Sequence, residues 1–370
     1  MRPSRWSVLE ERLSPYILLA PFLFFILVFF GYAFARALYF SFTDYNLFTK
    51  PTWIWFRNYA NLFRDYQFGR AFKNSVTFAV LVTFTQTALG LALAVFMNQR
   101  IRGIHFFRAA YYMPSVTSSV VITLIFMWLY QRMGLINFLA TKVMEHRVGI
   151  GLFFAVFAAA QTGLVRWERA HKRPAGALEP SLLLVSACAA AVVVWVLAFA
   201  GVVRPDSAVQ PIRTIWLNTR QTFPQWAGAL GFPVPLGAIM ILNIWTTAPT
   251  MMLLFLAGLQ DIPRELYEAA AVDGATGLAS FRHITLPCLR HVTFLVLTMG
   301  LISTLQMFDQ VAIVGDQAPL ESIITLAYYV YHNAFPGSAV PRIGMASAAA
   351  MILAVFTLVL VLVQKRITRA

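Results

Sequence analysis

The sequence predicts an all-α polytopic membrane protein with about eight transmembrane helices. Of its 370 residues, 59% are hydrophobic and 12% are charged, and a soluble domain has no interior large enough for so many apolar side chains. The apolar residues also form runs of about 18 or more, the length that crosses a bilayer as a helix. Helices are expected because backbone groups in lipid must be hydrogen-bonded internally, and the alternating pattern of barrel strands is absent.

Eight apolar runs are candidate spans. They cover approximately residues 16–40, 72–97, 106–130, 148–165, 181–203, 235–258, 289–314 and 343–363. The first run is too long for the apolar part of a signal peptide and no small-residue cleavage site follows it, so we expect a retained span. The fourth run is barely long enough, and a re-entrant or interfacial segment is its alternative.

The distribution of lysine and arginine predicts that both termini are cytoplasmic. Cytoplasmic loops carry an excess of these residues, and an even number of spans returns the C-terminus to the side of the N-terminus. The least basic long loop, 315–342, is then outside, as expected. The bias is modest, because the outer loop before the second span carries Lys50, Arg57, Arg64, Arg70 and Lys73.

The formal net charge of +14 has the same explanation. In a soluble protein this charge would suggest a nucleic-acid partner, but here the basic residues lie in loops between spans and hold the topology. No basic helix and no patch that mixes aromatic and basic residues interrupts this pattern, so we expect no nucleic-acid partner.

Sequence motifs for catalysis, nucleotide binding and metal binding are absent. The chain contains no Gly-Lys-Ser/Thr phosphate loop, no HExxH and no GxSxG. The two cysteines, Cys188 and Cys288, lie far apart and have no metal-like partner. We therefore expect a non-catalytic membrane subunit with no cofactor or metal of its own.

The segment from Glu268 to Pro287 is polar and lies between two long apolar runs. Its sequence is EAAAVDGATGLASFRHITLP. Just before this segment, Asp261 and Pro263 precede the first good helix formers, which predicts that a helix starts there. Asp273-Gly274 is a turn dipeptide. A second short helix over about 276–284 then reaches Pro287, which suits the first turn of the next span. The segment is predicted to be a rigid helix–turn–helix hook.

The spacing within this hook resembles the EAA loop of the membrane subunits of bacterial binding-protein-dependent ABC importers. The resemblance places the loop at 261–290 and implies that it inserts into a cleft on a separate ATPase. Glu268 would meet a basic group there, and ATP and magnesium would be bound by that ATPase. The implied coupling residues are Glu268, Ala269, Ala270, Asp273, Gly274, Ile284, Leu286 and Pro287.

Further motifs resemble the carbohydrate permeases, in particular the maltose (MalF) and glycerol-3-phosphate permeases. These motifs are Asn58-Tyr59, Gly134-Leu-Ile-Asn137 and Gln306-Met-Phe-Asp-Gln310. The resemblance implies a type I ABC importer (MetI-like) permease core over 55–365, preceded by an N-terminal transmembrane helix and outer loop at 1–54. The two apolar runs within 148–203 exceed the family's plan, and we interpret them as an inserted transmembrane hairpin.

Polar residues within the spans suggest where a solute could pass, because each is costly in lipid and needs a partner or a function. The resemblance to the maltose permease implies a substrate pathway at Ser115, Ser119, Asn243, Thr246, Thr247, Gly300, Ser303 and Met307. Serine and threonine also join helices in any membrane bundle, which is the structural alternative for each residue. In this family, moreover, the whole sugar site can belong to the other permease subunit.

The function implied by the resemblance is that of a permease subunit of an ATP-driven importer in the bacterial inner membrane. Its solute would be a sugar or sugar-like molecule of the oligosaccharide or glycerol-3-phosphate type. Its partners would be a second homologous permease, an ABC ATPase dimer, an extracytoplasmic solute-binding protein and membrane lipid. One alternative is an importer of a polyamine, phosphate or amino acid. The other is a secondary transporter, which would lack the EAA spacing and would usually show internal repeats.

Overall fold

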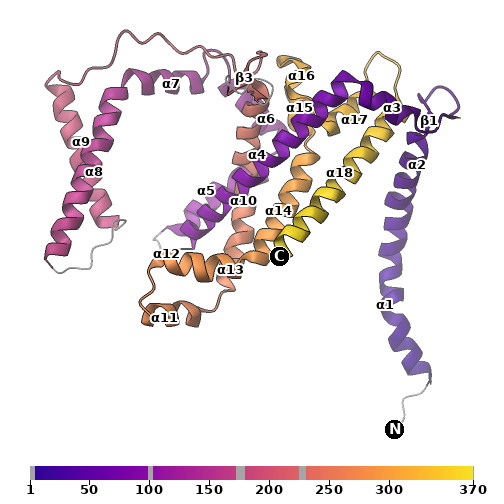
Figure 1. The fold of residues 1–370 in the computed structure, drawn as a ribbon, viewed down its shortest axis with the longest axis horizontal. Coiled ribbons are helices and arrows are strands. Elements are labelled where there is room, and N and C mark those ends of the chain that lie inside the picture. The colour runs from indigo at the N-terminus through magenta and orange to yellow at the C-terminus, as the bar shows by residue number, and fades with distance from the viewer. Residues whose placement is uncertain (1–4, 99–102, 172–179, 225–230, 370) are drawn as a thin grey trace. The chain divides into compact units, whose positions relative to one another are not determined.

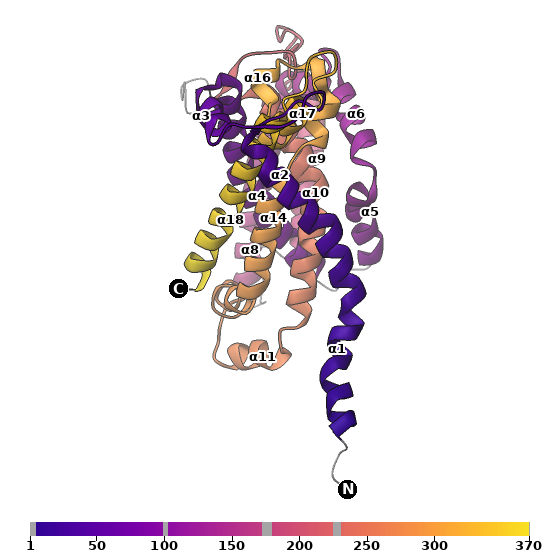
Figure 2. The ribbon, with the colours of Figure 1, turned by 90° about the vertical axis from the view of Figure 1, so that its right-hand side faces the viewer.

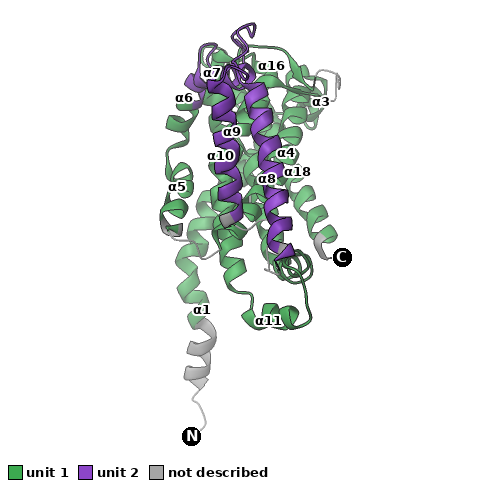
Figure 3. Ribbon diagram, turned by 90° about the vertical axis from the view of Figure 1, so that its left-hand side faces the viewer, with its two compact units in different colours: residues 1–125, 217–370 green, residues 126–216 purple. Residues whose placement is uncertain are grey.

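The computed structural model, drawn in Figure 1, describes residues 5–98, 103–171, 180–224 and 231–369. The chain divides into a first unit, residues 1–125 with 217–370, and a second unit, residues 126–216, which Figure 3 shows in two colours. The described elements are helices apart from two antiparallel pairs of two-residue strands. The predicted all-α class is therefore confirmed.

The elements of the first unit follow one another from the N-terminus to the C-terminus. They are α1 (Arg5–Ile26), η1 (Leu27–Gly31), α2 (Tyr32–Ser41), β1 (Thr43–Asp44), β2 (Thr52–Trp53), α3 (Arg57–Arg64), α4 (Tyr66–Met97), α5 (Ile104–Val116), α6 (Ser119–Leu129, which ends in the second unit), β3 (Thr222–Phe223), β4 (Phe232–Pro233), α10 (Val234–Gln260), α11 (Arg264–Val272), α12 (Gly277–Ser280), η3 (Phe281–Thr285), α13 (Leu286–Cys288), α14 (Arg290–Leu305), α15 (Asp309–Val314), η4 (Gly315–Gln317), α16 (Leu320–Ile323), α17 (Leu326–Ala334) and α18 (Ile343–Arg369). The second unit contains α7 (Leu135–Glu145), α8 (Arg147–Ala170) and α9 (Pro180–Phe199).

Seven of the described helices are long and apolar enough to cross a membrane, and one bent pair makes an eighth candidate. The candidates are Ser14–Ser41, Tyr66–Met97, Phe106–Val116 with Ser119–Leu129, Arg147–Glu168, Leu182–Phe199, Val234–Gln260, Arg290–Gln317 and Ile343–Ile367. The predicted plan of about eight spans is therefore confirmed.

The third predicted span, 106–130, is not one continuous helix, and in this respect the prediction is wrong. α5 and α6 meet at an angle of 96°. Pro114 removes a backbone donor from the last turn of α5, and Thr117, which follows that turn, has an extended backbone with φ −79° and ψ 145°. The seventh predicted span, 289–314, also contains a break, because α14 ends at Leu305 and α15 begins at Asp309.

Helices α4, α10 and α14 pack together within the first unit through small residues and polar contacts. At Gly90 a Cβ would lie 2.8 Å from the Cβ of Met251, so α4 and α10 approach closely there. The hydroxyl oxygens of Thr83 and Thr304 are 3.1 Å apart, which joins α4 to α14. Because lipid is as apolar as leucine, membrane helices associate through such close packing and hydrogen bonds.

The end of the first unit opposite α11 is built from α3, α16, α17 and the turn around β1, as Figures 1 and 2 show. Tyr329 of α17 is fully buried, and its hydroxyl donates to Asp65 Oδ2 at 2.6 Å. The Ser75 hydroxyl accepts from the Leu326 N–H at 2.8 Å. These bonds hold α17 against the start of α4.

The N-terminal helix α1 is apolar and unpacked along most of its length. The 18-residue apolar stretch that makes Ser14–Ser41 a candidate span has no buried residue. Large side chains such as Phe24 and Phe30 are more than two-thirds exposed, at 69% and 67%. A helix that is apolar all round requires lipid or a protein partner around it.

The second unit contains the two helices that the sequence predicts as an inserted hairpin. α8 and α9 pack against each other, and the Ser186 hydroxyl donates to Gln161 Oε1 at 2.7 Å in a buried contact. Both helices are long and apolar enough to span, which favours a hairpin over the re-entrant alternative for 148–165. The basic joint between them lies partly outside the described residues, and the insertion itself stays a prediction.

Candidate functional site

The polar loop between α10 and α14 begins with a helix that lies away from the core. α11 has no buried residue, Pro263 precedes it in an extended conformation, and Glu265 lies in its first turn, where a negative charge is favourable. Directly before Pro263, Ile262 is buried against a cluster that includes Phe255 and Leu289. The loop is therefore anchored to the helix bundle at its start and accessible along α11.

α11 ends in a turn that depends on Gly274. The Ala275 N–H donates to the Ala270 carbonyl at 2.8 Å and the Gly274 N–H to the Ala271 carbonyl at 3.1 Å, the paired bonds of a Schellman motif. Gly274 has φ +77°, a left-handed conformation that costs an L-residue about 1–2 kcal/mol. Nothing beyond its neighbours lies within 4 Å of the position a Cβ would take. Glycine is therefore required here for conformation and not for space.

The second limb of the loop returns to the bundle as a helical segment. The Thr276 hydroxyl caps the start of α12, which continues through the π-helical turn η3 into α13. The hydroxyl oxygens of Tyr267 and Thr285 are 2.9 Å apart, so α11 is tied to η3. The predicted helix–turn–helix is present, but Pro287 does not lie in the first turn of the next span. It lies in α13, because a break at Leu289 separates α13 from α14.

The predicted coupling residues all belong to this hook, which we define as residues 261–290. Glu268, Ala269, Asp273, Gly274, Leu286 and Pro287 are exposed, and Ala270 and Ile284 are half-buried. Three exposed large apolar side chains of the hook are not among the predicted coupling residues, since Leu266 is 44% exposed, Val272 is 88% exposed and Leu278 is 78% exposed.

The break between α5 and α6 brings hydroxyl groups and irregular backbone into the region of the spans. The Ser115 hydroxyl donates to the Tyr112 carbonyl at 2.8 Å, and the Thr117 hydroxyl donates to the Met113 carbonyl at 2.9 Å. Within a membrane, irregular backbone is tolerated where it is buried in protein or lines a water-filled cavity. The break is therefore a candidate position for a solute pathway.

A polar cavity of about 310 Å³ lies at this break, which we call the membrane cavity. α5, α6, α10 and the segment that joins α14 to α15 surround it. Its polar lining residues are Ser115, Thr117, Ser119, Asn243, Thr246, Thr247, Thr250, Ser303, Gln306, Asp309 and Gln310. Hydroxyl and amide groups both donate and accept hydrogen bonds, so the membrane cavity suits a polar, hydroxylated solute.

Two residues of α10 connect the membrane cavity to the neighbouring helices. Asn243 Nδ2 donates to Gln310 Oε1 at 3.2 Å, and the Thr247 hydroxyl donates to Gln86 Oε1 at 2.6 Å. Asn243 is buried, and its Oδ1 has no hydrogen-bond partner in the part of the chain that the structure describes.

Seven of the eight predicted pathway residues line the membrane cavity, and Gly300 does not. The seven are Ser115, Ser119, Asn243, Thr246, Thr247, Ser303 and Met307. Gly300 is buried and faces α4, where a Cβ would lie 2.6 Å from Gln86 Nε2 and 3.0 Å from Thr83 Cγ2. Glycine at this position lets α14 approach α4, and a place for Gly300 on the solute pathway stays a prediction.

Thr250, Asp309 and Gln310 also line the membrane cavity and are not among the predicted pathway residues. The Asp309 carboxylate accepts a hydrogen bond from the Ser119 hydroxyl. A charge near a membrane boundary is the signal that points to Asp309 in the sequence. No comparable signal points to Gln310, since the break after Leu305 that places it here is not visible in the apolar pattern.

A metal site is not evident, since no group of three or more His, Cys, Asp or Glu among the described residues could hold a metal ion. The first unit instead combines a polar cavity among candidate membrane spans with an exposed polar hook. This combination is that of a membrane transport subunit. The chain belongs to the family of binding-protein-dependent transport system inner membrane components, whose family model matches residues 86–370.

Curated relatives are similar over nearly the whole chain. The sulfoquinovosyl glycerol transport system permease protein SmoG of Agrobacterium fabrum is 28% identical, with 100% of this chain and 94% of SmoG covered. The arabinooligosaccharides transport system permease protein AraP of Bacillus subtilis is 26% identical, with 99% and 93% covered. A solved bacterial ABC transporter involved in alginate import matches with a TM-score of 0.65 at 21% identity, covering 98% of each chain. The predicted importer fold is therefore confirmed.

Proposed function

We propose that this chain is the permease subunit of an ATP-driven importer that moves a sugar or sugar-like solute into the cytoplasm. The observation that carries the proposal is the membrane cavity, whose hydroxyl and amide groups suit the many donors and acceptors of a sugar. Relatives named for sulfoquinovosyl glycerol, arabinooligosaccharides and trehalose/maltose support a carbohydrate solute.

The hook is the part of the chain through which ATP would act. Glu268, with Ala269 and Ala270 beside it, would enter a cleft on a separate ATPase. The anchored start at Ile262 and the Tyr267–Thr285 contact would pass the movement of the ATPase to α10 and α14. This chain would be non-catalytic, and ATP and magnesium would be bound by a dimer of ATPase subunits.

Transport would proceed by alternation between two states of a pair of permease subunits. A second homologous permease would complete the pathway, and an extracytoplasmic binding protein would deliver the solute. ATP binding would favour one state and hydrolysis the other, since a ligand shifts an equilibrium by its differential affinity for the two states. The hook would face the cytoplasm, as would both termini, in a bacterial inner membrane.

Reconstituted transport tests this proposal. The chain is assembled with a second permease, the ATPase and a binding protein in lipid vesicles, and uptake of labelled solutes is measured with and without ATP. We expect uptake of a sugar that requires both ATP and the binding protein. Uptake of a polyamine, phosphate or amino acid in place of sugars would contradict the substrate class. Uptake driven by an ion gradient without ATP would support the secondary-transporter alternative and overturn the proposal.

A further inference from the structure

We propose that the second unit binds an anionic phospholipid, with an acyl chain in a groove between α8 and α9 and the phosphate beside Arg204. We call this site the hairpin groove. It is defined by Gly149, Ile150 and Phe153 of α8, Val194 and Ala198 of α9, and Arg204. The inference goes beyond the proposed function, because it depends neither on the solute that is carried nor on the use of ATP.

The hairpin groove has a volume of about 400 Å³ and mainly apolar walls. Figure 3 shows α8 and α9 side by side in the second unit. A Cβ on the buried Gly149 would lie 3.3 Å from Val203 Cγ1, so the small residue lets the chain after α9 close over this end. Ile150 and Ala198 are exposed. Because α8 and α9 are both candidate membrane spans, the apolar group available to fill the groove is a lipid chain.

One positive charge remains unneutralised at the end of the hairpin groove. Lys142 Nζ lies 2.7 Å from Glu145 Oε2, and Arg147 Nη2 lies 3.0 Å from Asp206 Oδ2. These two ion pairs neutralise the neighbouring charges. Arg204 is exposed and forms no ion pair with a residue that the structure describes. An anionic headgroup would supply the missing partner, since basic side chains recognise such headgroups.

The turn after α9 fixes the place of the Arg204 side chain. The Gly201 N–H donates to the Ala198 carbonyl at 3.0 Å and the Val202 N–H to the Leu197 carbonyl at 2.9 Å, the paired bonds of a Schellman motif. Gly201 has φ +73°, and a Cβ there would lie 3.0 Å from Arg204 Nη2. The guanidinium group therefore packs against this turn, and a lipid would not have to order the turn on binding.

The charge and the groove follow one another as the phosphate and the chain of a phospholipid do. Trp195 and Phe199 are exposed with ring centroids 5.9 Å apart, and tryptophan is enriched at the membrane–water interface. Arg204 follows them and would lie at the level of the headgroups. Phe153 lies six residues beyond the first residue of α8, about 9 Å along the helix axis, and would lie in the hydrocarbon.

An anionic phospholipid suits this site better than the other candidate occupants. The apolar walls offer a sugar or a free phosphate few hydrogen-bond partners. Another membrane helix could cover the walls, but an apolar helix would leave Arg204 without a counter-charge. Topology does not explain the arginine either, because Arg204 belongs to a loop predicted to be outside, and outer loops are normally poor in basic residues.

Native mass spectrometry of the detergent-solubilised full chain tests the headgroup contact. The Kd of the first bound lipid is measured for phosphatidylglycerol and for phosphatidylcholine with the same acyl chains. In the wild type we expect about fivefold tighter binding of phosphatidylglycerol. Arg204→Gln should remove this preference, and Arg204→Lys, which keeps the charge, should retain most of it. Arg213→Gln is the matched control, because Arg213 is exposed in the same loop and does not line the groove. It should leave the preference unchanged.

A second pair of variants tests the acyl-chain contact. Ala198→Phe fills the hairpin groove and should raise the Kd of both lipids several-fold. Ala189→Phe is its control, because Ala189 is exposed and lies nine positions away, on the opposite face of α9. It should leave both Kd values unchanged. Phosphatidylglycerol should also raise the unfolding temperature of the wild type more than that of Arg204→Gln, since a ligand stabilises the state that binds it.

Three results would overturn the inference. The first is equal Kd for the two lipids in the wild type, or a preference for phosphatidylglycerol that survives in Arg204→Gln. The second is unchanged lipid binding in Ala198→Phe, which would leave the groove to a protein partner. The third is displacement of phosphatidylglycerol by inorganic phosphate but not by sodium chloride of the same ionic strength, which would identify a free-phosphate site. If Ala198→Phe does not fold, Ala198→Leu fills less of the groove and should still raise Kd.

Discussion

The two units of the chain use polar side chains within their membrane helices in different ways. In the first unit, hydrogen bonds join α4 to α10 at Gln86–Thr247 and α4 to α14 at Thr83–Thr304, and polar residues also line a cavity. In the second unit, the Ser186–Gln161 bond lies between two helices whose remaining surfaces are largely apolar. Polar groups in lipid are costly and often mark functional sites, so the contrast favours a solute pathway in the first unit.

The second unit has the properties of an accessory element by the same reasoning. One buried polar pair is enough to join two membrane helices, and the apolar residues of α8 and α9, such as Phe154 and Trp195, are well exposed. These faces suit lipid or another membrane protein. Changes at the hook or the membrane cavity of the first unit should therefore impair transport, whereas changes within the hairpin should affect stability alone.

The largest effect is expected at Gly274. Gly274→Val forces a β-branched residue into a left-handed conformation at φ +77°. This conformation costs an ordinary L-residue about 1–2 kcal/mol, and it costs a β-branched residue more. The Schellman turn should open, and ATP-driven uptake should be abolished while the chain still inserts into the membrane. Uptake by vesicles and the amount of inserted protein are measured together.

Gly274→Asn is the matched variant, because asparagine tolerates the left-handed conformation better than other non-glycine residues. It should retain a substantial part of the uptake that Gly274→Val loses. Equal loss in both variants would contradict a conformational role and would instead indicate that any side chain here blocks the ATPase. Wild-type uptake by Gly274→Val would contradict the coupling role of the hook altogether.

The second effect concerns Asn243 in the membrane cavity. Asn243→Ala removes the bond to Gln310 and an amide that lines the membrane cavity. The loss of one or two hydrogen bonds, worth roughly 1–2 kcal/mol, should raise the solute concentration for half-maximal uptake about tenfold. Thr298→Ala is the control, since Thr298 lies on α14, bonds to the carbonyl of Phe294, and does not line the cavity. Unchanged uptake in Asn243→Ala would place the sugar site on the partner subunit.

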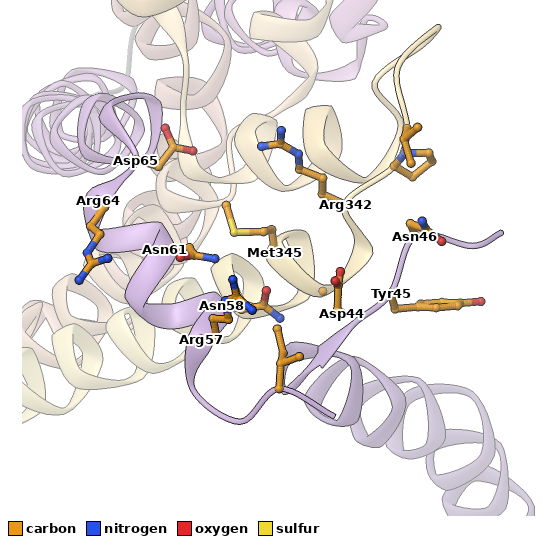
Figure 4. Close-up of a pocket in the computed structure, with 14 residues that line it drawn as sticks. Asp44, Tyr45, Asn46, Arg57, Asn58, Asn61, Arg64, Asp65, Arg342 and Met345 are labelled. Atoms are coloured by element: carbon orange, nitrogen blue, oxygen red, sulfur yellow. The ribbon is translucent and has the colours of Figure 1, made fainter. Parts of the chain in front are cut away.

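The sequence predicts the spans and the hook well because both are encoded locally. Apolar length defines a span, and Asp273-Gly274 defines a turn without reference to distant residues. Prediction from the sequence fails where packing between distant residues decides which side chains meet. Gly300 faces Gln86 and does not line the membrane cavity, and the break that places Gln310 in the cavity leaves no mark in the apolar pattern. The cleft lined by Arg57, Arg64 and Arg342 (Figure 4) is also beyond the sequence, because only folding brings Arg342 to α3.

A smaller effect is expected from Asp309, which is exposed and therefore partly screened. Asp309→Asn retains an oxygen that can accept from Ser119 and removes the negative charge. Uptake of a carboxylated sugar should rise a few-fold relative to its neutral counterpart, since Asp309 is the charged residue among those that line the cavity. Competition between the two labelled sugars measures this ratio. An unchanged ratio would show that the solute does not sense this carboxylate.

The smallest effect tests the accessory role of the second unit. Ser186→Ala removes the hydroxyl that bonds to Gln161, and an interhelical hydrogen bond in a membrane contributes about 0.6 kcal/mol on average. The thermal unfolding temperature of the detergent-solubilised chain should therefore fall slightly, while uptake kinetics stay at the wild-type level. Ala190→Ser, at a fully buried position of the same helix, is a control for polarity without loss of the bond. A marked fall in uptake by Ser186→Ala at unchanged protein levels would contradict the contrast between the units, because it would place the hairpin in the transport cycle.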